Sequence, residues 1–324
     1  MSMHRRKLLQ LAGALAVGGW SNAAGADTYP SRPVRILVGY AAGGGLDIAA
    51  RLIGQALSER LGQQFVVENR TGAATNIATE AVVRAPADGY TLLLANAANA
   101  INATYYENLS FDFIRDIAPV AGIGRFPYVM AVNPSFPANS VREFIDYAKA
   151  NPGKVNMGTG GAGGPDDASA ELLQLMTGIK MTHVPYRGTA PALTDLLAGQ
   201  VQMVFSTIPA AIHHIKSGAL RAIALTSATR LDTMPDIPTI GETVPGFESE
   251  QWYGVGAPAG TPAAVIATLN REVNAALADP KLKARIDQLG GVPLVMSPAE
   301  FGKFVARETE KMAKVIKAAG ISVK

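Results

Sequence analysis

Blocks of apolar residues separated by polar and glycine-rich segments run through most of the 324-residue chain, and the first clear block lies at residues 34–61. A short apolar run at 36–38 predicts a buried strand, and the three glycines at 43–45 predict a turn after it. An amphipathic helix should follow, because apolar residues recur at helical spacing at Ile48, Leu52, Ile53, Ala56 and Leu57. A strand, a glycine turn and a helix start form a generic anion-binding arrangement, since the first helical amides are unpaired and glycines let a ligand approach the backbone.

The same alternation continues to the end of the chain. Strands are expected at 64–68, 91–95, 127–132, 154–157, 181–185, 201–206, 220–226 and 252–255, and helices at 76–84, 140–149, 168–176, 190–197, 210–215, 262–277, 279–289 and 297–318. Continuous apolar strands separated by amphipathic helices favour parallel sheets covered by helices on both faces. The chain length suits two domains. We expect the helical tail to pack back on the first domain, which makes 123–133 and 248–256 crossover segments.

The first 26 residues have the pattern of a cleavable signal peptide. A basic segment, His4-Arg5-Arg6-Lys7, precedes an apolar run at 8–17, and Ala24-Gly25-Ala26 fits the small-x-small rule for a cut before Asp27. The apolar run is too short to span a bilayer, which disfavours a retained anchor. The paired arginines also resemble a twin-arginine signal, so the export route, Sec or twin-arginine, stays open. The mature chain should therefore be a soluble periplasmic protein.

The signal also accounts for the formal charge of +3. It contains three of the 29 basic residues and none of the 26 acidic ones, so the mature chain has equal numbers of both. A net charge near zero provides no overall field to attract nucleic acid or anionic lipid. We therefore expect no nucleic-acid partner.

The composition argues against most catalytic chemistry. The chain has no cysteine, which excludes thiolate catalysis, disulfides and cysteine-ligated metals. Beyond the signal only His183, His213 and His214 remain; His183 lies in an apolar strand and should be structural, and the other two should lie on a helix surface. No HExxH, P-loop or GxSxG motif occurs, and no nucleophile–base pair is recognisable. We expect no catalytic residue, metal or cofactor.

A second strand–glycine–helix block lies at 154–173 and repeats the first in kind. Each domain would thus have one backbone anion site near the carboxyl ends of a parallel sheet, where open α/β folds bind ligands. Two such loops facing across a cleft would hold a small anion, as in a hinged binding protein that closes on its ligand. The segment 158–163 also fits GxGxxG, so a dinucleotide site is the alternative.

With both loops identified, the chain closely resembles the Bug receptors, the TctC-like periplasmic solute-binding proteins of tripartite tricarboxylate transporters. The resemblance rests on YAAGGGLDIAAR at 40–51, VVENRTG at 66–72 followed by Asn76, DGYTLLL at 88–94, VPYRGTAPALTDLLAGQ at 184–200, PAGTP at 258–262 and AAGI at 318–321. It covers essentially the whole mature chain. It implies a type II-like two-domain periplasmic-binding-protein fold of α/β class, with a mostly parallel sheet in each domain and a ligand cleft between the domains. The implied domains are 27–128 plus 249–324 and 129–248.

The resemblance also implies the ligand and its contacts. A small organic carboxylate would lie between the two loops, partly held through water, for delivery to the membrane components of a transporter. The implied ligand-binding residues are Tyr40, Ala41, Ala42, Gly45, Asp47 and Asn76 in the first domain, and Thr159, Gly160, Asp167, Ser206 and Thr207 in the second. The alternatives are an exported sensor that reports to a signalling protein and an exported two-domain enzyme acting on a carboxylate. We expect a monomer.

The loops depart from the family pattern at three places. Ala42 stands where the family usually has proline, Leu46 where serine or threonine is common, and Asp166-Asp167 near a common histidine position. Aspartates in a first helical turn complement the helix dipole, which is the structural interpretation of Asp47, Asp166 and Asp167. If the last two face the cleft, they would repel a second ligand carboxylate. The ligand would then be a monocarboxylate or an amino-bearing carboxylate rather than citrate.

Three further residues are candidates for the site or its surroundings. Tyr40 should face the cleft because its loop lies there, whereas Trp252 is a core or a cleft residue with equal weight. Arg187 follows the strand at 181–185 and is interpreted first as a solvated surface residue, with an anionic ligand as the alternative.

Overall fold

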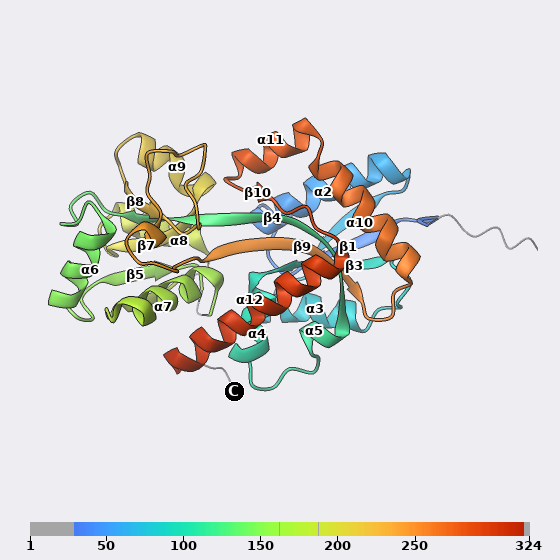
Figure 1. The fold of residues 1–324 in the computed structure, drawn as a ribbon, viewed down its shortest axis with the longest axis horizontal. Helices are drawn as coiled ribbons and strands as arrows, with labels where there is room; N and C mark the ends of the chain where they lie inside the picture. The colour runs from blue at the N-terminus through green and yellow to red at the C-terminus, as the bar shows by residue number, and fades with distance from the viewer. Residues whose placement is uncertain (1–28, 162, 187, 321–324) are drawn as a thin grey trace, which may run out of the picture.

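The computed structural model describes residues 29–161, 163–186 and 188–320. The predicted signal peptide, Arg187 and Ile321 of the closing motif lie outside the described residues. The strands are β1 (Val34–Val38), β2 (Phe65–Asn69), β3 (Thr91–Asn96), β4 (Ile117–Val132), β5 (Asn156–Thr159), β6 (Thr182–Pro185), β7 (Met203–Thr207), β8 (Arg221–Leu225), β9 (Glu250–Pro258) and β10 (Val292–Pro293). The helices are α2 (Gly45–Leu61), α3 (Asn76–Val83), α4 (Ala97–Tyr105), α5 (Phe113–Asp116), α6 (Val141–Ala150), α7 (Pro165–Thr177), α8 (Thr189–Leu197), α9 (Ile208–Lys216), α10 (Ala263–Leu277), α11 (Pro280–Gln288) and α12 (Pro298–Ala319), with short 3-10 turns at Ala73–Thr75 and Ile240–Glu242 (Figure 1).

The strands form two similar halves, joined through β4. The strand order is β2-β1-β3-β9-β4-β7-β5-β6, with β8 and β10 also paired to β4. In the first half β1 is parallel to β2 and β3, and in the second half β5 is parallel to β6 and β7. Each half therefore contains the same unit, in which a helix connects two adjacent parallel strands: α2 between β1 and β2, and α7 between β5 and β6.

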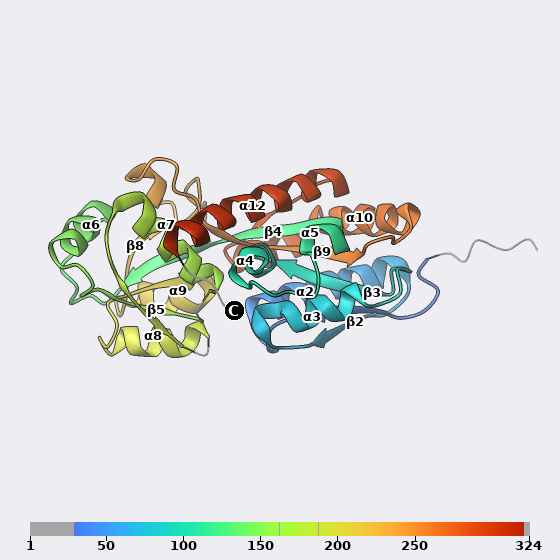
Figure 2. The same cartoon turned by 90° about the horizontal axis from the view of Figure 1, so that it is seen from below.

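Two long strands link the halves. Residues 117–127 of β4 pair with β9 in the first half, and residues 128–132 pair with β7 and β8 in the second. The β9 strand enters from the second half, where the Ser249 amide donates to the Thr226 carbonyl. The crossover expected at 123–133 and 248–256 is thus present, and Figure 2 shows both strands running along the molecule between the two helical layers.

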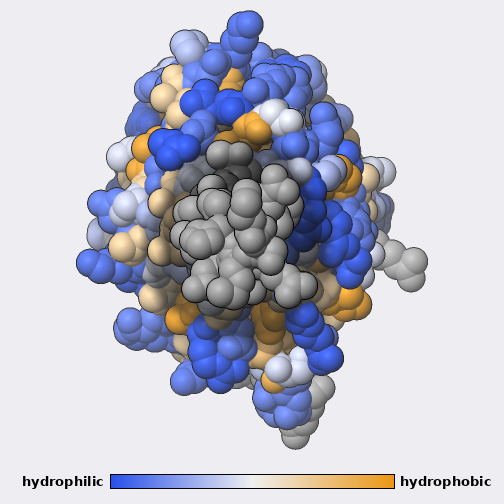
Figure 3. Space-filling model, turned by 90° about the vertical axis from the view of Figure 1, so that its right-hand side faces the viewer, coloured by the Kyte–Doolittle hydropathy of each residue, from blue (hydrophilic) through white to orange (hydrophobic). Residues whose placement is uncertain are grey.

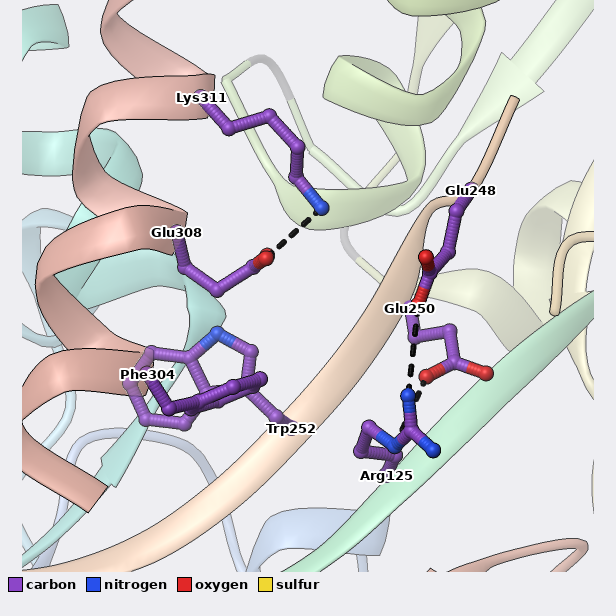
Figure 4. A pocket seen from close by; sticks show the side chains of 7 residues that line it. All are labelled: Arg125, Glu248, Glu250, Trp252, Phe304, Glu308 and Lys311. Carbon is purple, nitrogen blue, oxygen red and sulfur yellow. Dashed lines mark hydrogen bonds and ion pairs between the residues drawn. The ribbon is translucent and has the colours of Figure 1, made fainter. Parts of the chain in front are cut away.

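A charged cluster lies where these strands meet the C-terminal helix (Figure 4). Arg125 on β4 lies 3.3 Å from Glu248 and 3.5 Å from Glu250 at the start of β9, while Lys311 and Glu308 on α12 form their own ion pair. These side chains and Trp252 surround a cavity of about 10 Å³, the size of one water molecule. Burial raises the pKa of Glu250 to about 7, although the charge of Arg125 opposes the shift.

Each half has its own apolar core. One buried cluster includes Val34, Ile53 and Val273 under the sheet of the first half, and another includes Phe144, Met157 and Phe205 in the second. Helix α10 packs on α2 and β4 of the first half, as expected for the helical tail, whereas α12 packs against α4 in the first half and also against α7 in the second. The side of the first half seen in Figure 3 is mostly hydrophilic, with apolar residues scattered over it. Within the described ranges, none of the helices has the length and apolarity needed to cross a bilayer.

The structure corrects two expectations about secondary structure. The sheets are mixed, because β4, β8, β9 and β10 run antiparallel to a neighbour. Helix α4 was not expected, because its alanine-rich segment follows β3 with no glycine or proline between them. Asn96 starts it instead: its side chain accepts from the Ala98 amide and its own amide donates to Asn99.

Candidate ligand-binding site

The first loop, residues 39–47, presents open backbone to solvent. Residues 41–45 are all exposed, Gly43 has a φ of +87°, and α2 begins at Gly45 without a side-chain cap. The amides of Tyr40, Ala41 and Gly45 have no acceptor among the described residues. Exposed, unpaired N–H groups at a helix start are the arrangement that favours a bound anion.

Asp47 holds this loop in shape. Its carboxylate is only 2% exposed and accepts from the Gly43 amide at 2.9 Å, from Arg51 at 2.9 and 3.0 Å, and from the Asn69 side chain at 2.9 Å. Burial alone would raise the pKa of Asp47, but the hydrogen bonds from Arg51, Gly43 and Asn69 lower it below its usual value. With these donors already bound, Asp47 supports the loop from behind.

A strained turn lies beside the first loop. Ala73, Ala74 and Thr75 all have positive φ, at 44°, 46° and 81°, which is unusual for residues with a Cβ. A Cβ built on Gly39 would lie 2.5 Å from Thr75 Cβ, so this turn contacts the end of β1. The turn brings Asn76 to the start of α3, where its Oδ1 accepts from Asn102 and its buried Nδ2 has no partner among the described residues. Backbone strain of this kind commonly marks functional sites.

The second loop, residues 159–167, has the same shape but different hydrogen bonding. Its Gly163 has a φ of +71°, and α7 begins one residue after Gly164. The Gly160 amide donates to Asp166 at 2.6 Å, Gly161 to Thr159 Oγ1 at 3.0 Å, Gly163 to Asp167 at 2.8 Å and Gly164 to the Gly161 carbonyl at 3.0 Å. Every described amide between 160 and 164 is therefore already bound within the loop.

Asp167 takes the place in this loop that Asp47 takes in the first. It accepts from Gly163 and from His183 Nδ1 on β6, and His183 also lies 3.4 Å from Glu171. Burial would lower the pKa of His183, but the hydrogen bond and charge of Asp167 and the charge of Glu171 raise it overall. His183 is thus structural, as expected, and Asp167 points back into its own half.

Asp166 has a different partner: its carboxylate accepts from the Gly160 amide at 2.6 Å. It is 6% exposed, and burial raises its pKa to about 6, while the Gly160 amide opposes the shift. Its charge raises the pKa of Tyr40 on the first loop, where burial is the larger cause and the total brings it to about 12. It also raises the pKa of Tyr128 on β4, again after burial. Asp166 is therefore near the first loop and the crossover strands.

Three tyrosines lie between the loops. Tyr40 comes from the first loop, Tyr128 from β4 and Tyr253 from β9, and their hydroxyls form no hydrogen bond with other described residues. A Cβ on Gly45 would lie 3.0 Å from the Tyr253 hydroxyl, and one on Gly163 would lie 2.6 Å from the ring of Tyr105 on α4. The first loop thus lies against β9, and the second loop lies against α4 of the first half.

The structure places the remaining predicted residues as follows. Thr159 is fully buried, with its hydroxyl bonded to the Gly161 carbonyl, and Ser206 is fully buried in β7, with its hydroxyl bonded to the Thr207 carbonyl. Thr207 is half-buried and precedes α9. Trp252 packs against Phe301 and Phe304 in the core, which resolves its open assignment. His213 and His214 lie on α9, with His213 exposed.

Sequence reasoning missed Tyr128 and Tyr253 as site residues. The available signal was that each predicted crossover segment contains a tyrosine, at the point where both domains meet. The dinucleotide alternative loses support, because the described amides of this loop, those of 160, 161, 163 and 164, are bound within the loop and would not be free for a pyrophosphate. Over the described residues, no group of three or more acidic or histidine side chains has metal-binding geometry.

Two similar α/β halves, joined by crossover strands and contributing one glycine loop each to their junction, define a two-domain binding protein of the periplasmic type. Residues 49–321 match the family model described as "Tripartite tricarboxylate transporter family receptor". Protein BugT of Bordetella pertussis is 35% identical over 326 residues, covering 99% of this chain and 100% of BugT.

Solved structures agree with this class. The structure of R. palustris Rpa4515 with adipate has a TM-score of 0.83 and 38% identity, covering 91% of this chain and 99% of that one. MatC from Rhodopseudomonas palustris with bound malate has a TM-score of 0.78 and 31% identity, covering 89% of this chain and 100% of that one.

The chain belongs to the tripartite tricarboxylate transporter receptor family, which confirms the resemblance and the fold class inferred from the sequence. It is accordingly a solute-binding receptor of this transporter class. A further solved structure, described as periplasmic binding protein BugD, has a TM-score of 0.80 and 34% identity, covering 91% of this chain and 100% of that one.

Proposed function

We propose that this receptor captures a small organic carboxylate between its two domains and delivers it to the membrane components of a tripartite transporter. The observation that supports this most is the set of free amides on the first loop, at Tyr40, Ala41 and Gly45, in an exposed segment at a helix start. Such a site accepts sulfate, phosphate or carboxylate, and the ligands of the relatives favour carboxylate among these. The structures with adipate and malate are of relatives that share the fold.

The proposed contacts divide between the domains. The first loop, including Ala42, would bind the carboxylate, and the unpartnered Nδ2 of Asn76 would add a donor beside it. Gly160 and Thr207 would border the ligand from the second domain, while Asp47, Asp167, Thr159 and Ser206 would keep both loops in place. Closure would move 27–128 plus 249–324 relative to 129–248 about β4 and β9.

The remaining parts of the proposal concern the protein in the cell. Residues 1–26 would act as an export signal, and the mature protein would work as a periplasmic monomer without catalytic activity or a cofactor. A receptor that reports to a signalling partner would use the same site, so the ligand chemistry is common to both roles.

A thermal-shift panel of mono-, di- and tricarboxylates and acidic amino acids tests this proposal. A ligand in large excess over its Kd raises the apparent stability, by about 2.7 kcal/mol at a hundredfold excess. We expect at least one carboxylate to raise the melting temperature and to bind with one-to-one stoichiometry by calorimetry. Turnover of that ligand, or a copurified nucleotide in its place, would contradict the receptor function.

A further inference from the structure

The two loops can be compared position by position, because both run from a strand end to a helix start. Gly43 and Gly44 correspond to Gly163 and Gly164, and Asp47 corresponds to Asp167, since each aspartate accepts from the glycine four residues before it. By the same register Tyr40 corresponds to Gly160, and Leu46 to Asp166. This last pair differs in kind, because Leu46 is apolar and Asp166 carries a carboxyl group.

Leu46 is a core residue and Asp166 is not. Leu46 is 4% exposed and packs among the apolar side chains of the first half. Its loop forms the same turn with no carboxylate at that position, and the Tyr40 amide stays free. In the second loop the carboxylate of Asp166 turns back and accepts from the matching amide, that of Gly160. The carboxylate is therefore not needed to build the loop, but it occupies the position where an external anion would bind.

The surroundings of Asp166 indicate which ligand groups could bind beside it. Beyond the Gly160 amide, Tyr40 on the first loop and Tyr128 on β4 lie close enough for the charge of Asp166 to raise the pKa of their hydroxyls. Thr189 lies behind, with its hydroxyl 3.2 Å from a Cβ built on Gly160. A buried carboxylate beside the ligand position repels a second anion there and attracts a hydrogen-bond donor.

We propose that Asp166 determines ligand specificity: it fills the anion position of the second loop with its own carboxylate, so the ligand presents a hydroxyl or ammonium group to that side instead of a second carboxylate. This inference rests on the proposed function, in which the ligand's carboxylate binds the first loop. The preferred ligand class is then a hydroxy- or amino-monocarboxylate, and linear dicarboxylates bind weakly.

Pairs of matched probes test this specificity directly. The probes are the four-, five- and six-carbon linear monocarboxylates with a terminal hydroxyl or ammonium, and the α,ω-dicarboxylates of equal length, each titrated by calorimetry. The wild type should bind at least one hydroxyl or ammonium probe about tenfold more tightly than its dicarboxylate, which equals about 1.4 kcal/mol. Asp166→Asn should remove this preference by strengthening the dicarboxylate about tenfold and weakening the ammonium probe.

The variants distinguish a ligand that donates from a hydroxyl group from one that donates from an ammonium group. Asparagine still accepts from a hydroxyl, so Asp166→Asn should weaken the ammonium probe more than the hydroxyl probe. Asp146→Asn removes an exposed carboxylate from α6 of the same half and should change none of the ratios. Asp166→Ser serves as the second variant if the asparagine protein folds poorly, with the melting temperature of the unliganded protein as the check.

The outcomes are distinguishable. Equal or tighter wild-type binding of the dicarboxylates overturns the role of Asp166 and leaves the proposed function standing. The same holds if both variants keep the wild-type ratio, or if none of these probes binds while another carboxylate of the panel does. If no carboxylate of any kind binds, both proposals are overturned.

Discussion

The two glycine loops have the same backbone form but opposite hydrogen bonding. In the first loop the amides of Tyr40, Ala41 and Gly45 are free, and in the second loop every described amide from 160 to 164 is bound inside the loop. Three positions account for the difference: Asp166 binds the Gly160 amide where the first loop has Leu46, Thr159 Oγ1 binds the Gly161 amide, and Pro165 has no amide hydrogen where the first loop has Gly45. A strand–glycine–helix motif therefore predicts where an anion would bind, but the side chains around the loop decide which of its amides are open.

The two aspartates that hold the loops in shape, Asp47 in the first and Asp167 in the second, also have different partners. Asp47 is held by Arg51, whose charge is fixed, whereas Asp167 is held by His183, whose charge changes near neutral pH. The first loop should thus keep its shape over a wide pH range. The shape of the second loop should depend on pH, because the charge of His183 does.

The largest expected loss of stability and affinity comes from removing the charge of Asp47, which holds the first loop in shape. Asp47→Asn loses the ion pair with Arg51 and disturbs two further hydrogen bonds of a buried group, so the free energy of unfolding should fall by about 2–4 kcal/mol. Carboxylate affinity should fall at least about tenfold, because Gly43 loses its acceptor and the free amides lose their alignment. Urea denaturation and calorimetry measure the two effects.

Glu59→Gln, on the exposed face of the same helix, is the matched control and should leave both quantities within error. Normal affinity in Asp47→Asn would show that the first loop does not depend on this anchor. Since the pKa of Asp47 is lowered in the folded state, its contribution is present above the unfolded value of about 3.9 and is lost as the pH falls further.

The paired glycines provide the next test. A Cβ at Gly43 meets open space, so Gly43→Ala should cost only the left-handed backbone, about 1 kcal/mol. Gly163→Ala has the same backbone strain and also places its Cβ 2.6 Å from the ring of Tyr105, so it should cost about 2–3 kcal/mol. Chemical denaturation of both variants measures the difference. Equal losses would mean that Tyr105 does not pack against the second loop.

A smaller effect is expected where the halves join. Burial raises the pKa of Glu250 to about 7, so its neutral form is favoured in the folded state. The contribution of Glu250 to the free energy of unfolding is fully present below its pKa in the unfolded chain, about 4.3, and is lost as the pH rises through 7. Glu250→Gln should therefore be more stable than the wild type at pH 8, by about 1–3 kcal/mol, and equal to it at pH 4.5. The charged side chains that surround Glu250 are Arg125, Glu248, Glu308 and Lys311.

Thermal unfolding across this pH range measures the effect, and Glu310→Gln on the exposed side of α12 is the control. A constant difference between wild type and Glu250→Gln from pH 4.5 to 8 would contradict the titration of Glu250.

The smallest effect should come from His183. Its pKa is raised in the folded state, so its stabilising contribution is full below about 6.5 and is lost as the pH rises through the folded value. His183→Gln should remove a decline in stability above pH 6.5 of no more than about 1 kcal/mol. The decline is followed by denaturation at pH 6, 7 and 8. An identical decline in the variant would show that Asp167 does not depend on the charge of His183.

The sequence predicted the repeated strand–loop–helix units and the crossover segments because these depend on local periodicity. It did not predict the mixed sheets, because pairing partners such as β4 and β9 are far apart in the chain. It missed α4, whose start depends on a reciprocal bond between Asn96 and Asn99 rather than on a turn residue.

For the site, the position of both loops was predictable, but their hydrogen bonding was not. Which of Asp166 and Asp167 is bound by His183 could not be predicted, because His183 lies sixteen residues further along and binds only Asp167. Tyr128 and Tyr253 become neighbours of the loops only after the sheets form.

Binding of the ligand carboxylate to the free amides of the first loop is tested most directly by a titration of the ¹⁵N-labelled protein. The titrant is the tightest-binding carboxylate of the panel, and the readout is the amide chemical shift. We predict that the amide protons of Tyr40, Ala41 and Gly45 move downfield on saturation, as expected for new bonds to an anion, while those of Gly161 and Gly163 move much less. Large downfield shifts at Gly161 and Gly163, with none in the first loop, would contradict this binding mode.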